Sequence, residues 1–344
     1  MKKTALSVVL LAILVLLPSC RRKEDSSAAG APKPYVVGIF QSVDSPTANE
    51  VRRGILQAFA DAGLRDGKEV VVTIRIANND ISEVQRIARQ LVAERVDMII
   101  PMSTQALQAA ILASRTTPIV FSAVAVPYLV GAGRSADDHL GNVTGVASTG
   151  PIRQTMALIR EVLPEARRVG SLWTPSEINS EYYLDLARES AAELGFEMIA
   201  LPVTGPHAIQ GLVQGLLNEK VDVLFPMSDN TINSSFDVIG QAAEENGLPL
   251  FGSFLRSVEF GACAALGFDF YDMGTKTGLI AVRVKNGESP ARIPIQSMDE
   301  VRLFINTEAA GKQGVSFSKG LLDRVNKVVR VALGPSKGPG SVID

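Results

Sequence analysis

The chain has 344 residues, of which 46% are hydrophobic and 20% are charged, and its formal net charge at pH 7 is −2. This balance excludes a strongly basic surface, so nucleic acid is not an expected partner. The length is sufficient for two α/β lobes of ordinary size.

The first twenty residues have the pattern of a secretory signal. Lys2 and Lys3 give a basic start, Ala5 to Leu17 carry no charge, and Leu17-Pro18-Ser19-Cys20 follows. The uncharged run is shorter than the run of about 20 residues that a membrane span needs. This ending resembles the lipobox of bacterial lipoproteins, although small residues are commoner than proline at that place. An ordinary secretory signal or an uncleaved anchor is the alternative, with Cys20 incidental.

We therefore expect residues 1–19 to be a signal peptide and Cys20 to be lipidated. A lipid anchor would hold the protein in the cell envelope, on the periplasmic or extracytoplasmic face of a bacterial membrane. Residues 20–34 contain Ala, Gly and Pro without core periodicity, which predicts a tether. Loss of residues 1–19 removes two lysines and no acid, so the net charge moves from −2 to −4. Cys263 is then the only cysteine left besides Cys20; its apolar neighbours predict a buried residue, and no internal disulfide is expected.

From Tyr35 onward, short β-branched runs alternate with segments of helical period. In the first half, the expected strands and helices are Tyr35–Phe40, a helix starting near Ser45-Pro46, Val70–Ile76, a helix carrying Val84, Ile87, Leu91 and Val92 on one face, Met98–Ile100, Gln105–Ala113 and Pro118–Val124. The second half continues with Ile152–Leu163, Val169–Trp173, Ser180–Leu194, Met198–Val203, Ala208–Leu217, Val221–Phe225, Thr231–Glu245, Leu248–Phe254, Ala262–Gly267 and Tyr271–Lys285. Strands that alternate with crossover helices indicate parallel sheets covered by helices on both faces.

One segment of ten residues occurs twice. Residues 94–103 and 219–228 are identical at six of ten positions, with a constant offset of 125 residues. Each copy reads as a helix end, a buried strand and a loop that opens the next helix. The repeat predicts two equivalent lobes, each like half of a Rossmann-type sheet; the alternative is convergence of apolar strands. The two loops would lie at the carboxyl ends of their strands, where open α/β sheets bind ligands.

No catalytic or metal-binding pattern accompanies these strands. The two histidines, His139 and His207, lie in polar or helix-opening stretches and have no partner at a metal-ligand spacing. Neither a dinucleotide fingerprint nor a phosphate-binding loop is present. We therefore expect a binding protein rather than an enzyme, with no catalytic residues, no metal and no cofactor.

The residues at the expected strand ends are small and hydrogen-bonding. Ser103 and Thr104 open a helix, where backbone N–H groups and the helix dipole favour a carboxylate. Asp229, Glu177 or Asp269 would then face an ammonium group. Serine and aspartate also cap helices for structural reasons alone. The aromatic residues expected near this edge either stack on a flat ligand or pack in the core; they are Phe40, Trp173, Tyr182 and Tyr271.

At these loops the sequence resembles the ABC transporter substrate-binding lipoproteins of the group with tryptophan- and tyrosine-binding members. The likeness runs from residue 35 to about 310, and the segments that carry it are Val37-Gly38-Ile39 to Gln41, Val96-Asp97 to Ser103-Thr104, Pro118 to Val124, Gly141 to Gly145, Leu163 to Ala166, Ser176 to Ser180, Asp229-Asn230-Thr231 and Gly267 to Gly274. Where many relatives carry a Thr-Asp-Pro-like string, this chain has Ala125-Val126-Pro127, which puts an aromatic specificity in question.

The resemblance implies a type I periplasmic-binding fold whose two lobes are linked by three crossings and a hinge, with a cleft between them. Lobe 1 would be 35–146 plus 255–286, lobe 2 would be 147–254 plus 287–310, and 311–344 would be a C-terminal segment and tail. It also implies ligand contacts at Gln41, Ser103, Thr104, Gln105, Ser122, Ala123, Ser176, Glu177, Asn179, Ser180, Asp229, Asn230 and Asp269.

The function expected from this sequence is capture of a small solute by hinge closure and its delivery to the membrane permease of an ABC importer. An amino acid, with aromatic ones among the candidates, comes first, and a nucleoside or another small polar solute comes second. The chain is expected to act as a monomer. The alternatives are a sensor that reports the ligand to a membrane signalling partner, an enzyme of doubly wound fold, and a surface lipoprotein that binds only proteins.

Overall fold

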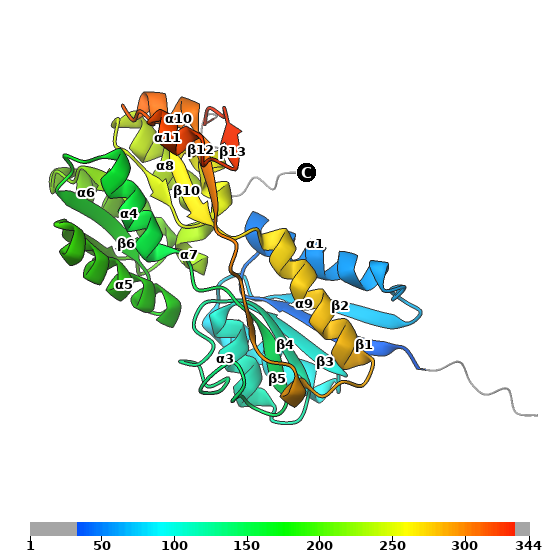
Figure 1. Ribbon diagram of the computed structural model, residues 1–344. Coiled ribbons are helices and arrows are strands. Elements are labelled where there is room, and N and C mark those ends of the chain that lie inside the picture. The colour runs from blue at the N-terminus through cyan, green and yellow to red at the C-terminus, as the bar shows by residue number, and fades with distance from the viewer. Residues whose placement is uncertain (1–32, 334–344) are drawn as a thin grey trace, which may run out of the picture. The chain divides into compact units, whose positions relative to one another are not determined.

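Two α/β lobes make up the part of the computed structural model that is described, residues 33–333 (Figure 1). The predicted signal peptide, Cys20, most of the tether and the tail from residue 334 lie outside this range. No helix within it is long and apolar enough to cross a membrane.

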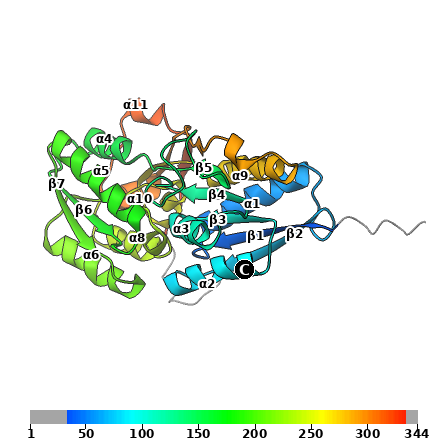
Figure 2. The ribbon, with the colours of Figure 1, turned by 90° about the horizontal axis from the view of Figure 1, so that it is seen from below.

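Lobe 1 is built on one six-stranded sheet with the order β11-β5-β4-β3-β1-β2. Strands β3 and β5 are buried along their whole length, because helices cover both faces of the sheet. Helices α1 and α9 lie on one face and α2 lies on the other (Figure 2). In chain order, the elements are β1 (Tyr35–Gln41), α1 (Pro46–Asp61), β2 (Val70–Ile76), α2 (Ile81–Ala93), β3 (Met98–Met102), α3 (Thr104–Ala113), β4 (Ile119–Val124), β5 (Val143–Ala147), α9 (Phe270–Lys285), η3 (Pro290–Arg292) and β11 (Gln296–Ser297).

Helices α1 and α9 approach each other closely because glycines line their contact. A Cβ atom added at Gly54 would lie 2.2 Å from the carbonyl oxygen of Tyr271, and one added at Gly274 would lie 2.0 Å from that of Val51. Backbone atoms cannot yield as a flexible side chain can, so both positions require glycine. This contact fixes the first turn of α9, and with it the segment that enters lobe 1 from lobe 2.

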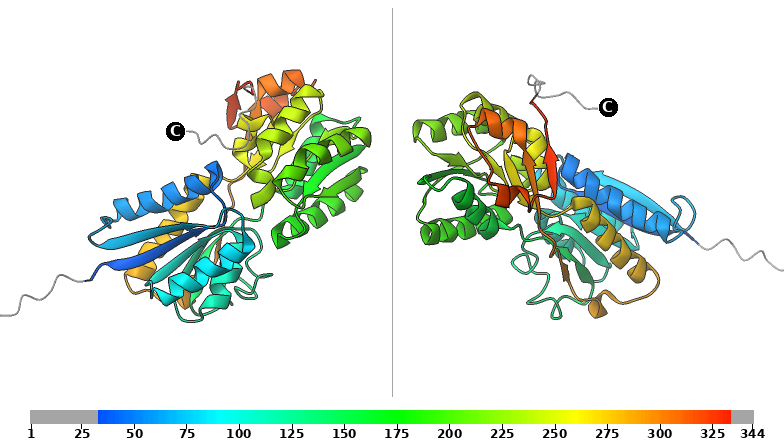
Figure 3. Two further views of the ribbon diagram at one scale, coloured as in Figure 1. Left: turned by 180° about the vertical axis from the view of Figure 1, so that it is seen from behind. Right: turned by 45° about the horizontal axis from the view of Figure 1, so that its top comes forward.

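Lobe 2 contains the strand orders β7-β6-β8 and β13-β12-β10-β9, and a parallel bridge between Leu224 and Leu250 connects them. Strand β12 runs antiparallel to β10, and the other pairs in these two groups are parallel. The orange and red segments of Figure 3, α10 with β12 and β13, lie together in this lobe. In chain order, the elements are α4 (Ile152–Val162), β6 (Arg168–Trp173), α5 (Ile178–Leu194), β7 (Glu197–Pro202), η1 (Pro206–Ala208), α6 (Ile209–Asn218), β8 (Val223–Leu224), α7 (Asn230–Asn233), α8 (Phe236–Glu245), β9 (Phe251–Gly252), η2 (Leu255–Phe260), β10 (Ala264–Gly267), β12 (Arg302–Asn306), α10 (Thr307–Lys312), α11 (Lys319–Leu322) and β13 (Lys327–Val329).

The repeated segment occupies equivalent places in the two lobes. In both copies the residue after the helix, Arg95 or Lys220, adopts a left-handed conformation with φ of 55° or 54°. The aspartate that follows ties the new strand to the first strand of its sheet: Asp97 accepts from the Val36 N–H at 2.7 Å, and Asp222 accepts from the Arg168 N–H at 2.8 Å. The sequence repeat is therefore a repeat of backbone geometry and hydrogen bonding.

The chain passes between the lobes three times: after β5, after β10 and after β11. Two expected boundaries need correction. The resemblance places residues 255–267 in lobe 1, but β10 pairs with β9 and β12 of lobe 2. It places all of 287–310 in lobe 2, but β11 pairs with β5 of lobe 1. Short apolar strands carry no sequence mark of the sheet they join, so only the pairing assigns them.

Several elements differ from the sequence expectation. The helix expected over Thr231–Glu245 is two helices, α7 and α8, and the Ser234 hydroxyl at the break donates to the Thr231 carbonyl at 2.9 Å. Serine hydroxyls compete in this way with the backbone bonds of a helix. The strand expected at Leu248–Phe254 is reduced to the two residues of β9. Strands β5 and β12 were not anticipated. Cys263 is fully buried, as predicted.

Candidate ligand-binding site

A pocket that opens to solvent is lined by residues of both lobes, and its empty space, including the open part, is about 850 Å³. Its walls come from the ends of β3 and β4, the segments after β8 and β9, the N-terminal turns of α1, α3, α5, α7 and α9, and the first two crossings between the lobes. Among the lining residues that the structure describes, Asp229 is the only acidic or basic one. The lining residues are Val43, Ser45, Thr47, Ala48, Val51, Met102, Ser103, Thr104, Ala123, Ala125, Ser148, Gly150, Asn179, Tyr183, Ser228, Asp229, Asn230, Asn233, Ser253, Phe268, Phe270 and Met273.

On the lobe 1 side, two helices begin at the pocket. The Ser45 hydroxyl caps α1 by accepting from the Ala48 N–H at 3.2 Å, and the Ser103 hydroxyl caps α3 by accepting from the Ala106 N–H at 3.1 Å. The hydroxyl oxygens of Ser42 and Ser103 are joined by a hydrogen bond of 2.5 Å. The remaining N–H groups of each first turn have no partner within the helix and lie at the positive end of its dipole. This side of the pocket therefore suits an anionic group, although it contains no basic side chain.

Strand β4 is distorted where it reaches the pocket. Ala123 has a φ of +53°, and the pairing with β5 is irregular between Phe121 and Val124. A non-glycine residue in this conformation costs about 1–3 kcal/mol, and bulges of this kind often redirect side chains at functional sites. Beyond the bulge, the Ala125 N–H donates to the Thr104 hydroxyl at 3.3 Å, which joins the β4 end to the start of α3.

On the lobe 2 side, Asp229 follows β8 and caps α7. One carboxylate oxygen accepts from the Ile232 N–H at 2.7 Å, and the other accepts from the Ser180 hydroxyl at 2.6 Å. The side chain is almost completely buried, with 3% of the residue exposed. Burial, and then the nearby negative charge of Glu177, raise the pKa of Asp229 to about 8.

Glu177 lies behind Asp229, outside the pocket wall. It is buried, and its carboxylate accepts four hydrogen bonds: from the backbone and side chain of Asn230 at 3.0 and 2.6 Å, and from the backbone and hydroxyl of Thr231 at 3.0 Å each. Its two oxygens are thus occupied by the first turn of α7. Glu177 positions the loop that carries Asp229 rather than facing the pocket.

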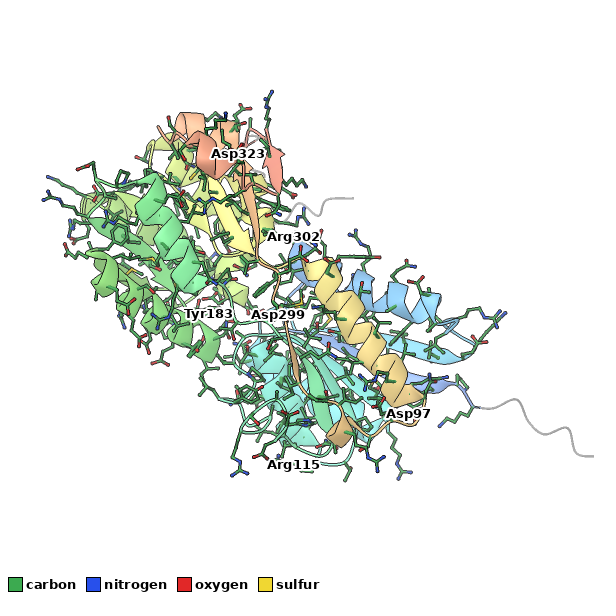
Figure 4. The ribbon with its side chains drawn as sticks, viewed as in Figure 1. Asp97, Arg115, Tyr183, Asp299, Arg302 and Asp323 are labelled. Atoms are coloured by element: carbon green, nitrogen blue, oxygen red, sulfur yellow. The ribbon has the colours of Figure 1, made fainter. Side chains whose placement is uncertain are left out.

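The aromatic side chains of the pocket are Phe268, Phe270 and Tyr183. The two phenylalanines flank the second crossing, at the start of α9. Tyr183, which Figure 4 labels, belongs to α5. Its hydroxyl accepts from the Gly150 N–H at 3.0 Å and donates to the Ser148 carbonyl at 3.2 Å, and these two bonds attach the first crossing to lobe 2. None of the four aromatics singled out from the sequence is in this wall; Phe40 is fully buried in the core of lobe 1, for example.

Six of the thirteen predicted contact residues line the pocket: Ser103, Thr104, Ala123, Asn179, Asp229 and Asn230. The other seven, Gln41, Gln105, Ser122, Ser176, Glu177, Ser180 and Asp269, do not. Ser180 supports Asp229, Ser122 accepts from the Thr277 hydroxyl of α9 at 2.7 Å, and Gln41 accepts from Arg52 at 2.5 Å. Asp269 caps α9 and forms an ion pair with Arg302 at 2.7 Å, so its charge is already compensated.

Two buried oxygens of the pocket wall have no hydrogen-bond partner: the Asn179 Oδ1 and the Ser253 Oγ. An unpaired buried polar atom costs about 1–3 kcal/mol, so such atoms mark places where a ligand donor gains binding free energy. Both atoms come from residues of lobe 2. No sequence pattern identifies Ser253, because its strand reads as an apolar run. Within residues 33–333, no cluster of His, Cys, Asp and Glu side chains is suited to a metal ion.

Two parallel α/β lobes, three connecting segments and a polar pocket between the lobes define a type I periplasmic-binding fold. A crystal structure of a conserved domain protein from Vibrio cholerae matches with a TM-score of 0.83 and 30% identity, covering 86% of this chain and all of that one. A Streptococcus pneumonia ABC domain in complex with L-Trp matches with a TM-score of 0.82 and 26% identity, over 86% of this chain and all of that one. The fold class predicted from the sequence is thereby confirmed.

Family membership follows from the sequence comparisons. The family model described as ABC transporter substrate binding protein matches residues 36–329. A tyrosine-binding protein from Clostridioides difficile (strain R20291) is 30% identical over 314 residues, which cover 89% of this chain and 91% of that protein. The chain belongs to the ABC transporter substrate-binding protein family, and the resemblance seen in the sequence is confirmed.

Proposed function

We propose that this protein is the lipid-anchored receptor of an ABC importer and that it binds an amino acid in the pocket between its lobes. The observation that carries the proposal is the opposed polarity of the pocket wall. A single buried carboxylate, Asp229, comes from lobe 2, and the first turns of α1 and α3 come from lobe 1. A zwitterion places its ammonium group at the first and its carboxylate at the second.

Hinge closure follows from the same arrangement. Because the two charged ends of the ligand are held by different lobes, the complete set of contacts exists only when the lobes enclose the ligand. The closed, occupied receptor would dock on the permease, and a separate ATPase would supply the energy. The chain itself would act as a monomer without turnover, on the extracytoplasmic side of the membrane.

The ligand is an amino acid with a neutral side chain, and an aromatic one is favoured. Phe268, Phe270 and Tyr183 supply flat apolar surface, and the wall offers no basic side chain to an acidic ligand. The tyrosine-binding relative and the tryptophan complex agree with this choice. Ala125 lies in the wall within the Ala-Val-Pro string, so this part of the wall is apolar.

Mass spectrometry of small molecules released by denaturing the purified protein tests the ligand class. The expected result is a compound that carries both a primary amine and a carboxylate, and the same compound should raise the melting temperature of the emptied protein. Recovery of a sugar, a nucleoside or an amine-free solute that restores stability would contradict the proposal.

The anchor and the transport role need separate measurements. Labelled palmitate should be incorporated into the wild-type protein and not into Cys20→Ser. Uptake of the identified ligand should stop when the gene for this chain is deleted. Normal uptake in the deletion strain, with a changed response of a membrane signalling protein, would favour the sensor alternative.

A further inference from the structure

Two buried carboxylates, those of Glu177 and Asp229, lie together without a cationic partner. Glu177 is 1% exposed and Asp229 is 3% exposed. Both are joined to the first turn of α7, Glu177 through Asn230 and Thr231, and Asp229 through Ile232. Within residues 33–333, no Arg, Lys or His nitrogen lies within 4.0 Å of either carboxylate.

Such a pair resists carrying two negative charges. Removing a carboxylate from water costs several kcal/mol when no cation replaces the lost hydration, and a second carboxylate nearby adds repulsion. Glu177 accepts four hydrogen bonds and is well supplied with donors, so the proton is expected on Asp229. This agrees with the pKa of Asp229, which burial and the charge of Glu177 raise to about 8.

The groups that face Asp229 from the other elements supply no positive charge to offset the two carboxylates. The lining residues from α1, α3, β4 and α9 are uncharged. On α5, Ser180 donates a hydrogen bond to Asp229, and Tyr183 stays neutral because burial raises the pKa of its phenol far above the usual value. Among residues 33–333, no group supplies the missing positive charge, and a ligand cation can supply it.

The unpartnered oxygens of the wall indicate which cationic group of the ligand supplies this charge. Asn179 and Ser253 are more than nine-tenths buried, and their Oδ1 and Oγ have no partner. Together with Asp229, they give the lobe 2 part of the wall three side chains whose oxygens can accept hydrogen bonds from a ligand. A primary ammonium carries three N–H donors, whereas a quaternary amine carries none and a hydroxyl carries one.

We propose that this site takes its ligand as a primary ammonium and that binding expels one proton from the Glu177–Asp229 pair into solvent. The inference rests on the proposed function, because it concerns the amino-acid pocket, and it names the acid that holds the amine. The ligand's ammonium brings one positive charge to the acid pair, and the Asp229 carboxyl loses its O–H proton to solvent. The net charge of the ammonium together with the two carboxylates therefore equals that of the empty pair, while the ligand's own carboxylate lies at the helix starts of lobe 1. Asp229 contacts the ligand; Glu177 is a positioning residue that acts through Asp229.

Proton release makes the affinity depend on pH in a defined direction. Below the pKa of about 8, the empty site holds the proton that the ligand must displace, so affinity falls as pH falls. For one displaced proton, affinity changes by about tenfold per pH unit well below this pKa and becomes independent of pH above it, until the ligand amine itself loses its proton.

Isothermal titration calorimetry of the mature chain with L-tyrosine and L-tryptophan provides the test. At pH 7, titrations in phosphate and in Tris, whose ionisation enthalpies differ, give the number of protons released. We expect close to one proton, with about tenfold weaker binding at pH 6 than at pH 7. The deaminated analogues, hydroxyphenylpropionate and indolepropionate, should not bind detectably.

Two variants separate the contact residue from the positioning residue. Asp229→Asn should abolish proton release and weaken binding by more than about 100-fold, as expected for the loss of a buried charge partner. Glu177→Gln keeps a hydrogen-bond acceptor behind α7 but removes the neighbouring charge, which lowers the pKa of Asp229. It should therefore release fewer protons at pH 7 and show a flatter pH dependence between pH 6 and pH 8. Thermal unfolding of each variant checks that the fold is retained.

The outcomes distinguish this inference from the function on which it rests. Tight amino-acid binding without proton release, equal at pH 6 and pH 8, would overturn the proton coupling and leave the receptor intact. A Glu177→Gln protein with the wild-type pH profile would overturn the role of Glu177. Failure of every L-amino acid to bind at any pH would overturn both proposals.

Discussion

The two copies of the repeated segment share a scaffold and differ in charge where they reach the pocket. In both, an aspartate ties the strand to its neighbour, and Pro-Met-Ser ends the strand. In lobe 1 the next helix, α3, is capped by the hydroxyl of Ser103. In lobe 2 the next helix, α7, is capped by the carboxylate of Asp229 and supported by Glu177. The backbone framework is thus duplicated, whereas the side chains that cap the helix after the repeated strand differ between the lobes.

This difference gives the pocket its polarity. The neutral cap on α3 leaves the positive end of a ten-residue helix uncompensated. The acids around α7 leave an excess of buried negative charge. The two lobes share one backbone framework and line a common pocket. Acidic residues after the repeated strand of one lobe alone are therefore sufficient to give this pocket opposite polarity at its two sides, as a dipolar ligand requires.

The largest expected effect comes from removing the carboxylate that caps α7 in lobe 2, in comparison with removing the hydroxyl that caps α3 in lobe 1. Asp229→Asn should weaken amino-acid binding by more than about 100-fold, whereas Ser103→Ala should weaken it by only about threefold to tenfold, because backbone N–H groups of α3 remain in place. Titration calorimetry at pH 8, where the wild-type affinity is highest, measures both.

A stability comparison controls for the fold in this pair. Because the folded-state pKa of Asp229 is raised, the wild-type empty protein loses stability as pH rises from about 4 toward 8. Asp229→Asn has no group to ionise, so its stability relative to wild type should increase across that window. Equal losses of affinity in Asp229→Asn and Ser103→Ala would mean that the caps of α7 and α3 do not differ in their contribution to ligand binding.

A second comparison concerns the shared scaffold and should affect stability without affecting binding. Asp222 accepts from two backbone N–H groups, those of Arg167 and Arg168, whereas Asp97 accepts from one, that of Val36. At about 1 kcal/mol for each exposed hydrogen bond, Asp222→Ala should cost about 2 kcal/mol and Asp97→Ala about 1 kcal/mol. Urea unfolding measures the difference. Equal costs would contradict the assignment of these effects to the number of hydrogen bonds, and a change in ligand affinity in either variant would contradict a purely structural role.

The sequence predicted the scaffold better than the tips. The apolar runs and the repeat sufficed for two parallel lobes, because buried strands and amphipathic helices leave periodic patterns. The sequence does not predict strand β12, because tertiary contacts decide which strand it pairs with. The sequence also placed Glu177 and Asp229 at the correct edge, but it could not tell which carboxylate faces the pocket.

Side-chain direction explains the remaining differences at the site. Asp269 has the same relation to a strand end as Asp229, yet Arg302, which comes from β12 far along the chain, holds it outside the pocket. Phe268 and Phe270 lie within a segment that carried the family resemblance, but their role depends on the second crossing, whose place the sequence did not mark. A pattern of residues specifies which edge they occupy; the partners they meet there depend on the packed fold.

The smallest predicted effect concerns a direct contact between the lobes. The Asn79 side chain of lobe 1 donates from Nδ2 to the hydroxyl of Thr231 at 2.9 Å, and that hydroxyl donates in turn to Glu177. Asn79 has a left-handed φ of 63°, so Asn79→Gly removes the contact without straining the backbone. Affinity should fall about fivefold, the equivalent of one hydrogen bond, while the stability of the empty protein stays unchanged or increases. Asn78→Gly, at the neighbouring left-handed position with φ of 49°, is the matched control and should leave affinity unchanged. If both substitutions reduced affinity equally, loop flexibility rather than the contact with Thr231 would be responsible; if neither did, this hydrogen bond would contribute nothing to holding the lobes around the ligand.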